Sequence, residues 1–178
     1  TLGLSLLVAG QWEEARMQYE ASAASGGETG ALPTFMTSGA EMGLTGDEIA
    51  EHAVSFARVM GASDPEAARV LGPALADGST DEELVERARE SVAGLIADSV
   101  LTLQMIAGLY TKLGDHDTAL DWLETLTAGG SLSAGIVGVD PALDPLRGYP
   151  RMQALMDGLG LPNGYDPEAD SYEPEGTL

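Results

Sequence analysis

The feature that most constrains the fold of this chain is a helical pattern in residues 103–126, LQMIAGLYTKLGDHDTALDWLETL. Apolar residues recur there at spacings of three and four, which places them on one face of each helix. Gly114 suits the positive φ that ends a helix, and Asp115 offers a carboxylate to the free amides that begin the next. The pattern therefore predicts a hairpin of two amphipathic helices. Because one hairpin cannot bury both apolar faces, neighbouring helices are required.

The spacing within this hairpin resembles that of the tetratricopeptide repeat, a helix-turn-helix unit of about 34 residues. The matching positions are Leu103, Ile106, Ala107, Tyr110, Gly114, Ala119 and Leu123. Leu123 and Leu126 stand where that family favours an aromatic and a small residue. The resemblance implies an all-α fold in which such hairpins form a right-handed superhelical array. It also implies protein–protein interaction or intramolecular regulation in a bacterial signalling or transcriptional regulatory protein.

A second copy of the pattern lies at the start of the chain. Its matching residues are Leu2, Gly3, Leu6, Gly10, Ala15, Tyr19 and Ser22. Gly10, Gly46, Gly78 and Gly114 recur at intervals close to one repeat length, so two further units are expected between the clear copies. We therefore expect about four hairpins, at approximately residues 1–26, 31–62, 64–97 and 98–129, within one repeat domain of residues 1–162.

The two middle hairpins depart from the family spacing, because Glu51 and Glu83 stand where a small residue is expected. Their helix-start signals are nevertheless clear. These signals are Thr45 or Asp47 with Glu48, the capping-box sequence of residues 79–83, and Asp64 followed by Pro65. The apolar faces expected to be buried are Ile49, Ala50, Ala53, Phe56, Ala57 and Met60 in one helix, and Leu84, Ala88, Val92 and Leu95 in another. Residues 32–43 and 64–76 are expected to be the partner helices, and a different all-α packing of residues 30–97 stays open.

The Pro-rich segment of residues 131–162 resembles the tail that closes tetratricopeptide arrays in many bacterial regulatory proteins. The residues that carry this resemblance are Val139-Asp140-Pro141, Asp144-Pro145-Leu146-Arg147, Pro150-Arg151-Met152, Leu155 and Leu159-Gly160-Leu161-Pro162. We expect a short helical cap in which Met152, Leu155, Met156 and Leu159 cover the last hairpin. Residues 163–178 carry five acidic and no basic residues and are expected to form a flexible acidic tail.

The composition excludes several classes of function. A net charge of −21, from 29 acidic and 8 basic residues, argues against binding of nucleic acid through its phosphates. The absence of cysteine excludes disulfides, thiolate metal ligands and a cysteine nucleophile. No apolar run approaches the roughly 18 residues of a membrane span, and the given sequence contains no basic start followed by an apolar core of the kind that marks a signal peptide. The chain begins at Thr1 inside a helical pattern, which indicates a piece of a longer protein, and we expect a cytoplasmic location without membrane insertion.

The residues most able to carry chemistry are better explained as parts of helices. His116 lies between two aspartates in a turn, and His52 stands beside glutamates without a second histidine for a zinc site. The carboxylates of residues 82–90 have the spacing of a solvated helix face. No nucleophile motif or calcium loop is present. We therefore expect no catalytic residue, no metal site, no cofactor and no enzymatic activity.

Two functions remain after this elimination. The first is a protein-binding scaffold that accepts a peptide, a helix or another domain of the parent protein in a groove formed by the repeats, with Gln104, Thr111 and Lys112 as candidate partner-binding residues. A strongly acidic groove would favour a basic or a helical apolar partner, and homo-oligomerisation stays open. The second is a sensor in which the middle hairpins enclose a small ligand; it is motivated by Gly72-Pro73 within a helical pattern.

Overall fold

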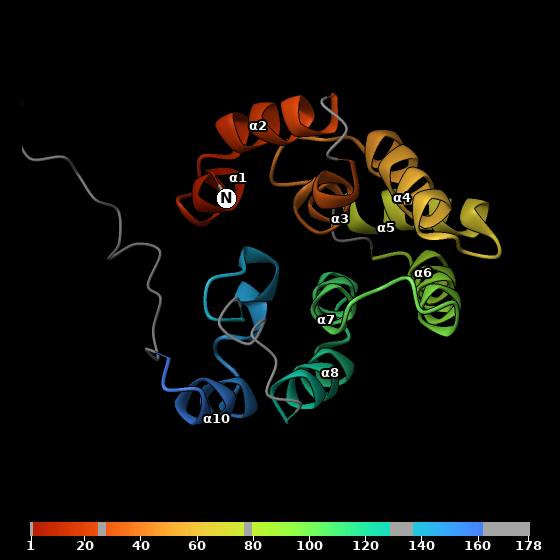
Figure 1. Ribbon diagram of the computed structural model, residues 1–178. Helices are drawn as coiled ribbons and strands as arrows, with labels where there is room; N and C mark the ends of the chain where they lie inside the picture. The colour runs from red at the N-terminus through yellow and green to blue at the C-terminus, as the bar shows by residue number, and fades with distance from the viewer. Residues whose placement is uncertain (1, 25–27, 77–79, 129–136, 162–178) are drawn as a thin grey trace, which may run out of the picture.

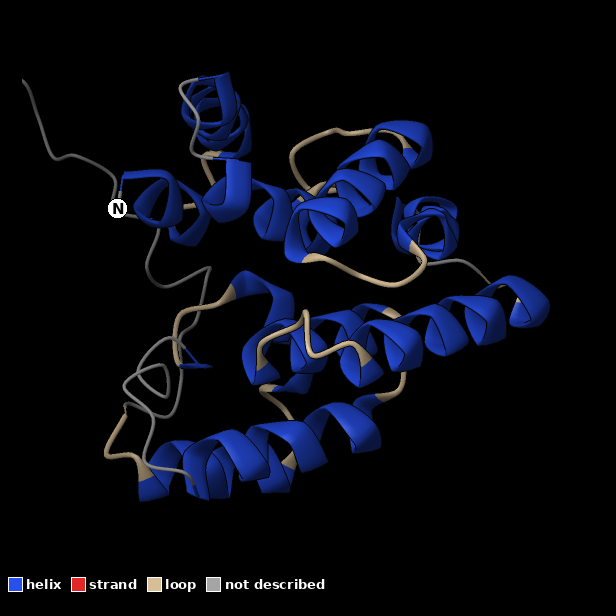
Figure 2. Ribbon diagram, turned by 45° about the vertical axis from the view of Figure 1, so that its right-hand side comes forward, coloured by secondary structure: helices blue, strands red, loops and turns tan. Residues whose placement is uncertain are grey.

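A computed structural model describes residues 2–24, 28–76, 80–128 and 137–161 of the chain. Throughout these ranges the regular secondary structure is helical and no strand occurs, as Figure 2 shows. The all-α fold class expected from the sequence is confirmed. Gly78, the glycine pairs at residues 26–27 and 129–130, and the acidic tail of residues 163–178 lie outside the described residues.

The helices follow one another along an arc that runs from α1 and α2 through α4 and α6 to α8 and α10, with α3 and α7 on its inner side (Figure 1). Their bounds are α1 (Leu2–Val8), α2 (Trp12–Ala24), α3 (Glu28–Ser38), α4 (Gly46–Met60), α5 (Leu71–Ala76), α6 (Glu82–Ala97), α7 (Leu103–Lys112), α8 (His116–Ala128) and α10 (Pro150–Gly158). Two 3-10 helices, η1 (Pro65–Val70) and η2 (Pro141–Leu146), complete the described elements. Within these elements no helix is long and apolar enough to cross a membrane.

The helix ends form where the sequence places their capping residues. Thr45 accepts a hydrogen bond from the Glu48 amide while Glu48 accepts one from the Thr45 amide, so the helix start predicted here is present and takes the form of a capping box. The Asp64 side chain accepts from the Ala67 amide with Pro65 in the first turn of η1. Asp81 likewise caps α6. These bonds fix where three of the middle helices begin.

The turn between α3 and α4 differs from the prediction, which placed the turn glycine at Gly46. The residue with positive φ is Gly43, at +74°, and the Leu44 amide donates to the Gly39 carbonyl oxygen. Gly46 instead begins α4. A Cβ there would lie only 3.1 Å from Pro73 Cα, so a close helix contact, rather than a turn, explains the small residue.

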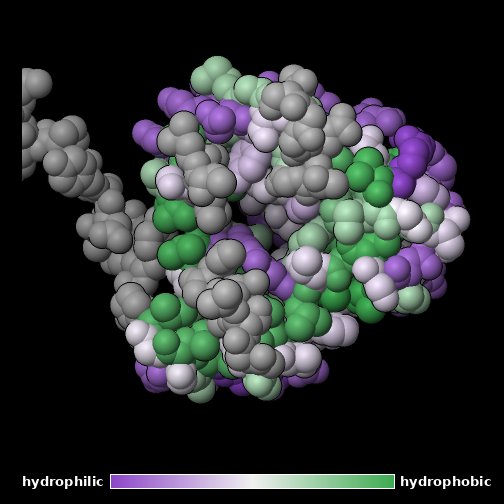
Figure 3. Space-filling view, viewed as in Figure 1, coloured by the Kyte–Doolittle hydropathy of each residue, from purple (hydrophilic) through white to green (hydrophobic). Residues whose placement is uncertain are grey.

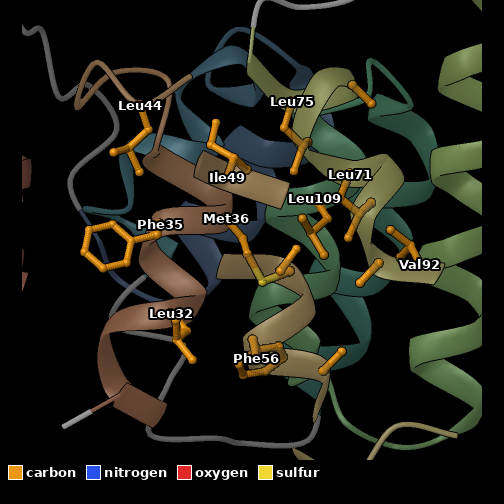
Figure 4. Close-up of a cluster of buried hydrophobic side chains, with 14 of the residues drawn as sticks. Leu32, Phe35, Met36, Leu44, Ile49, Phe56, Leu71, Leu75, Val92 and Leu109 are labelled. Carbon is orange, nitrogen blue, oxygen red and sulfur yellow. The ribbon is translucent and has the colours of Figure 1, made fainter. Parts of the chain in front are cut away.

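The apolar faces pack into two hydrophobic clusters that meet at α7. One cluster joins residues from α1 through α7, and the other joins α7 and α8 to the cap. Figure 4 shows part of the first, with side chains of α3, α4, α5, α6 and α7 gathered together. Of the residues expected to be buried, Met60 is 43% exposed and Leu84 is half-buried, whereas the other members of those two faces are buried. In the cap, Met152 and Met156 are buried.

The helix expected at residues 64–76 is divided into η1 and α5. Gly72 lies where α5 crosses α4, because a Cβ there would lie 2.1 Å from the Gly46 carbonyl oxygen and 2.5 Å from Ala50 Cβ. Pro73 falls in the first turn of α5, where a missing amide hydrogen removes no bond within that helix. Close packing of two helices therefore accounts for the Gly72-Pro73 pair.

The arrangement departs from a series in which each hairpin contacts only the next. Helix α3 lies against α7, and η2 packs against both of them. Expected hairpin contacts are also present, since α1 packs on α2, α3 on α4, and α7 on α8. The described residues thus form packed helical hairpins with a helical cap, and the right-handed superhelical array stays a prediction.

Candidate binding groove

A groove with a volume of about 850 Å³ runs between α4, the η1–α5 segment and α6. We call it the α4–α6 groove. It is lined by Asp47, Ala50 and Glu51 from α4; by Ser63, Asp64, Glu66, Ala67, Arg69, Val70 and Pro73 from the η1–α5 segment; and by Leu84, Arg87, Glu90, Ser91, Gly94, Leu95 and Asp98 from α6 and its end. Apart from Ser63 and Asp98 at their boundaries, these residues belong to the two middle hairpins, whose sequence departs most from the repeat spacing.

The long wall of the groove is one face of α6. Its lining residues recur at spacings of three and four from Leu84 to Asp98, so they form a single stripe along the helix. At 1.5 Å per residue this stripe is roughly 21 Å long. Most of the charged side chains that line the groove are exposed, including Glu51, Arg87 and Glu90. The groove is therefore elongated and open to solvent.

Hydrogen bonds join α6 to the η1 segment along the groove. The Ser91 hydroxyl donates to the Ala67 carbonyl oxygen at 2.9 Å. Asp98 accepts from both the amide and the hydroxyl of Ser63, each at 2.8 Å. These two bonds, the amide bond first, lower the pKa of Asp98 below its ordinary value. The groove therefore lies between elements that are tied to each other rather than beside a loose helix.

The charge of the groove is predominantly negative. Six carboxylate residues and two arginines line it. Arg69 lies between two of the carboxylates, with Glu51 at 2.6 Å and Glu66 at 3.0 Å, and its hydrogen bond lowers the pKa of Glu51. Figure 3 shows hydrophilic side chains, in purple, over α4 and at the edge of α6.

Arg87 differs from the other basic residues of the chain. The remaining Arg and Lys residues each lie within ion-pair distance of a carboxylate, namely Arg16, Arg58, Arg69, Arg89, Lys112, Arg147 and Arg151. Among the described residues Arg87 has no such carboxylate, although Glu83 and Glu90 stand one helical turn away on either side. Within the same ranges Asp47 and Glu90 also have no ion pair. The groove thus contains charges of both signs that the fold does not neutralise.

Gly94 lies in the interior of α6 and faces the groove. A Cβ at this position would meet no atom within 4 Å. Glycine in a helix interior costs roughly 1 kcal/mol relative to alanine, so the fold gains nothing from it here. Because glycine has no side chain, no atoms project into the groove at this position, which Ala67 and Leu95 also line. In the sequence, the sign of this feature is a single glycine, Gly94, within a clear helical pattern.

The three residues predicted to bind a partner lie on α7, outside the α4–α6 groove. The Gln104 amide donates to an Asp140 carboxylate oxygen at 2.7 Å, and Lys112 forms an ion pair with Glu41. Thr111 is buried, and its hydroxyl donates to the Ala107 carbonyl oxygen. The contacts of Gln104 and Lys112 hold α7 to its neighbours, whereas the Thr111 bond lies within α7. Partner binding by Gln104, Thr111 and Lys112 stays a prediction.

The two histidines make structural contacts. His52 stacks on Phe35 with ring centroids 4.3 Å apart, and burial lowers its pKa. His116 Nδ1 lies 2.7 Å from the Tyr149 hydroxyl, which joins the start of α8 to the cap. In the parts of the chain that the structure describes, no group of three or more His, Asp or Glu residues is placed to hold a metal ion.

Comparison with known proteins identifies no relative of this chain. No family model matches the chain, and no curated protein or solved structure matches it significantly. The tetratricopeptide resemblance consequently rests on residue spacing alone.

Proposed function

We propose that this chain is a non-catalytic protein interaction domain of a larger bacterial regulatory or signalling protein. A peptide, a helix or another domain of the parent protein docks in the α4–α6 groove. The observation that supports the proposal is an open groove that follows α6 from Leu84 to Asp98 and is lined by both charged and apolar residues. Elongated grooves between helices are a recurrent mode of peptide recognition.

The dimensions of the groove suit a segment of protein. A length of roughly 21 Å matches about 14 residues of α-helix at 1.5 Å per residue. It also matches about six residues of extended chain at 3.3 Å per residue. Val70 and Leu84, both half-buried, give the segment an apolar surface to cover, and Gly94 leaves room for its backbone.

The second candidate is a small-ligand sensor, and the location of the groove in the middle hairpins favours it. Pockets for small molecules usually enclose most of the ligand and have mainly apolar walls with few polar groups. Here eight charged residues line the groove, and the side chains of Glu51, Glu66 and Arg69 are between 48% and 66% exposed. The geometry therefore supports the interaction domain better than the sensor.

Site-directed photo-cross-linking in the source cell tests the proposal. A photoreactive phenylalanine analogue at Arg87, on the groove wall, is expected to capture a protein, and the added substitution Gly94→Phe is expected to abolish that product. The matched control places the same analogue at Gln153, an exposed residue of α10. A capture at Arg87 that survives Gly94→Phe would contradict the proposal. A metabolite that raises the melting temperature of the wild type but not of Gly94→Phe would favour the sensor.

A further inference from the structure

We propose that the occupant of the α4–α6 groove is an amphipathic α-helix of about four turns that carries a net positive charge. The inference rests on the proposed function and specifies its partner class. Three observations support it: the shape of the groove, the unused space at Gly94 and the sign of its charge.

The shape favours a helix over an extended strand. The residues that line the groove from α6 recur at spacings of three and four from Leu84 to Gly94, with Asp98 at the helix end, so the wall is one helical stripe. A second helix packs along such a stripe by placing its side chains between these residues. An extended peptide gains most where it adds hydrogen bonds to a sheet edge, and the elements that line this groove are helices.

The space at Gly94 is what a close helix contact requires. The contact between α4 and α5 within this chain depends on the same kind of space. Gly72 has no side chain, and α5 lies so close to α4 that a Cβ at this position would be 2.1 Å from a backbone oxygen of α4. At Gly94 the corresponding space is empty, with no atom within 4 Å. Ala67 and Pro73, which are exposed and face the same groove, keep the opposite side shallow. The backbone of a partner helix can therefore pack directly against Gly94.

The charge favours a basic helix. Asp47 on α4 and Glu90 on α6 lack ion pairs in the described part of the chain and place negative charge on both walls. Glu51 and Glu66 are balanced, because both pair with Arg69 and Glu66 also pairs with Arg58, so the excess negative charge comes from the other carboxylates of the groove. With a net charge of −21 on the whole chain, a positively charged partner is attracted before contact. Arg87 is the one unpaired positive charge on these walls, in the described residues, and opposes that attraction.

The experiment uses a library of random peptides of roughly 16 residues, long enough for the four helical turns of the groove. Peptides are selected on the intact 178-residue chain, synthesised, and measured by fluorescence anisotropy. The selected peptides are expected to be rich in Lys and Arg, to repeat apolar residues at spacings of three and four, and to gain helical circular dichroism on binding. Selection of acidic or neutral peptides, or of peptides that bind without helix formation, would overturn the inference.

A matched pair of substitutions at one position locates the binding. Gly94→Phe fills the groove and is expected to weaken peptide binding at least about tenfold, whereas Gly94→Ala is expected to change it less than about twofold. The helical circular dichroism of both free variants verifies their folding. Equal binding to Gly94→Phe and wild type would place the peptide elsewhere and overturn both the inference and the proposed function. If the selected peptides are not basic but still lose binding to the Gly94→Phe variant, only the inference of a basic helix would be overturned, and the proposed function would stand.

A second pair on adjacent turns of α6 tests the charge. Glu90→Arg is expected to weaken a basic peptide about fivefold at low salt, and Arg87→Glu to strengthen it by a similar factor. Both differences should shrink at about 1 M salt, where charges are screened within a few ångströms. Weaker binding by Arg87→Glu would show that the partner supplies a carboxylate at this point, and that result would overturn the preference for a basic helix.

Discussion

Gly72 and Gly94 are both helical glycines, yet their surroundings are opposite. At Gly72 a Cβ would collide with the Gly46 carbonyl oxygen and with Ala50, whereas at Gly94 it would enter open space. The first glycine lets two helices of the same chain touch. The second has no contact to permit within the described fold, although it faces a groove lined by three helical segments. The comparison teaches that a helical glycine can mark a close contact made within the chain, as at Gly72, or a place where the chain itself makes no contact, as at Gly94, where we propose that a partner binds.

The largest expected effect follows from Gly72→Ala. The added methyl group cannot fit unless α5 moves away from α4, so the free energy of unfolding should fall by about 3 kcal/mol, the upper end for overpacked cores. Urea denaturation followed by circular dichroism measures it. A loss below about 0.5 kcal/mol would show that α5 moves without cost and would remove the contrast with Gly94.

Gly94→Ala should act in the opposite direction. The methyl group meets nothing, and alanine restrains the unfolded chain, so the free energy of unfolding should rise by about 1 kcal/mol. The same denaturation measurement applies. Destabilisation by this substitution would mean that the space beside Gly94 is filled in the free protein, and the groove would then be closed.

Ser91→Ala tests whether the hydrogen bond from Ser91 to Ala67 holds α6 to η1 along the groove. The loss of a largely buried hydrogen bond should lower the free energy of unfolding by about 1 kcal/mol. Amide hydrogen exchange should increase first in η1. Uniform exchange across α6 and η1, with unchanged stability, would show that this contact contributes nothing to the groove.

The smallest effect concerns His52. Burial lowers its pKa below the ordinary 6.5, against the opposing charges of Glu20, Glu48 and Glu51 and with the help of Arg16. The unfolded chain therefore binds the proton at a higher pH than the folded chain does. Stability should fall as the pH drops through 6.5 toward the lower folded pKa.

The substitution His52→Gln removes this titration and should flatten the pH dependence of stability between roughly pH 7.5 and 5.5. Urea denaturation at several pH values measures the slope for both proteins. An equally steep slope in the variant would show that another group titrates, and the stacking on Phe35 would then carry no pH dependence.

Much of the fold follows from local sequence signals. Thr45 and Asp81 mark the starts of α4 and α6 because capping depends on residues only two or three positions away. The apolar faces of those helices were predicted for a similar reason, since helical periodicity is a local property. The division of residues 64–76 into η1 and α5 was not predicted, because it depends on how closely Gly72 approaches α4.

The groove, and the contacts that the predicted site residues make, depend on parts of the chain that are distant in sequence. Gln104 pairs with Asp140, and Lys112 pairs with Glu41. Spacing along the chain gives no information about such partners. The groove similarly arises from the relative positions of α4, η1 and α6. The Gly72-Pro73 pair motivated a pocket in the middle hairpins, but no residue pattern predicted this groove. Periodicity therefore predicted the helices, whereas their tertiary placement determined which surfaces stay uncovered.

The contact of α3 with α7 and η2 has a consequence for how the chain folds. A linear array of repeats melts in stages, because each unit depends only on its immediate neighbours. Here residues of the second hairpin touch the fourth hairpin and the cap, so loops of many residues must close before those contacts form. The described hairpins should thus unfold in one cooperative transition. Loss of the cap would loosen α3, far earlier in the sequence, at the same time as α8.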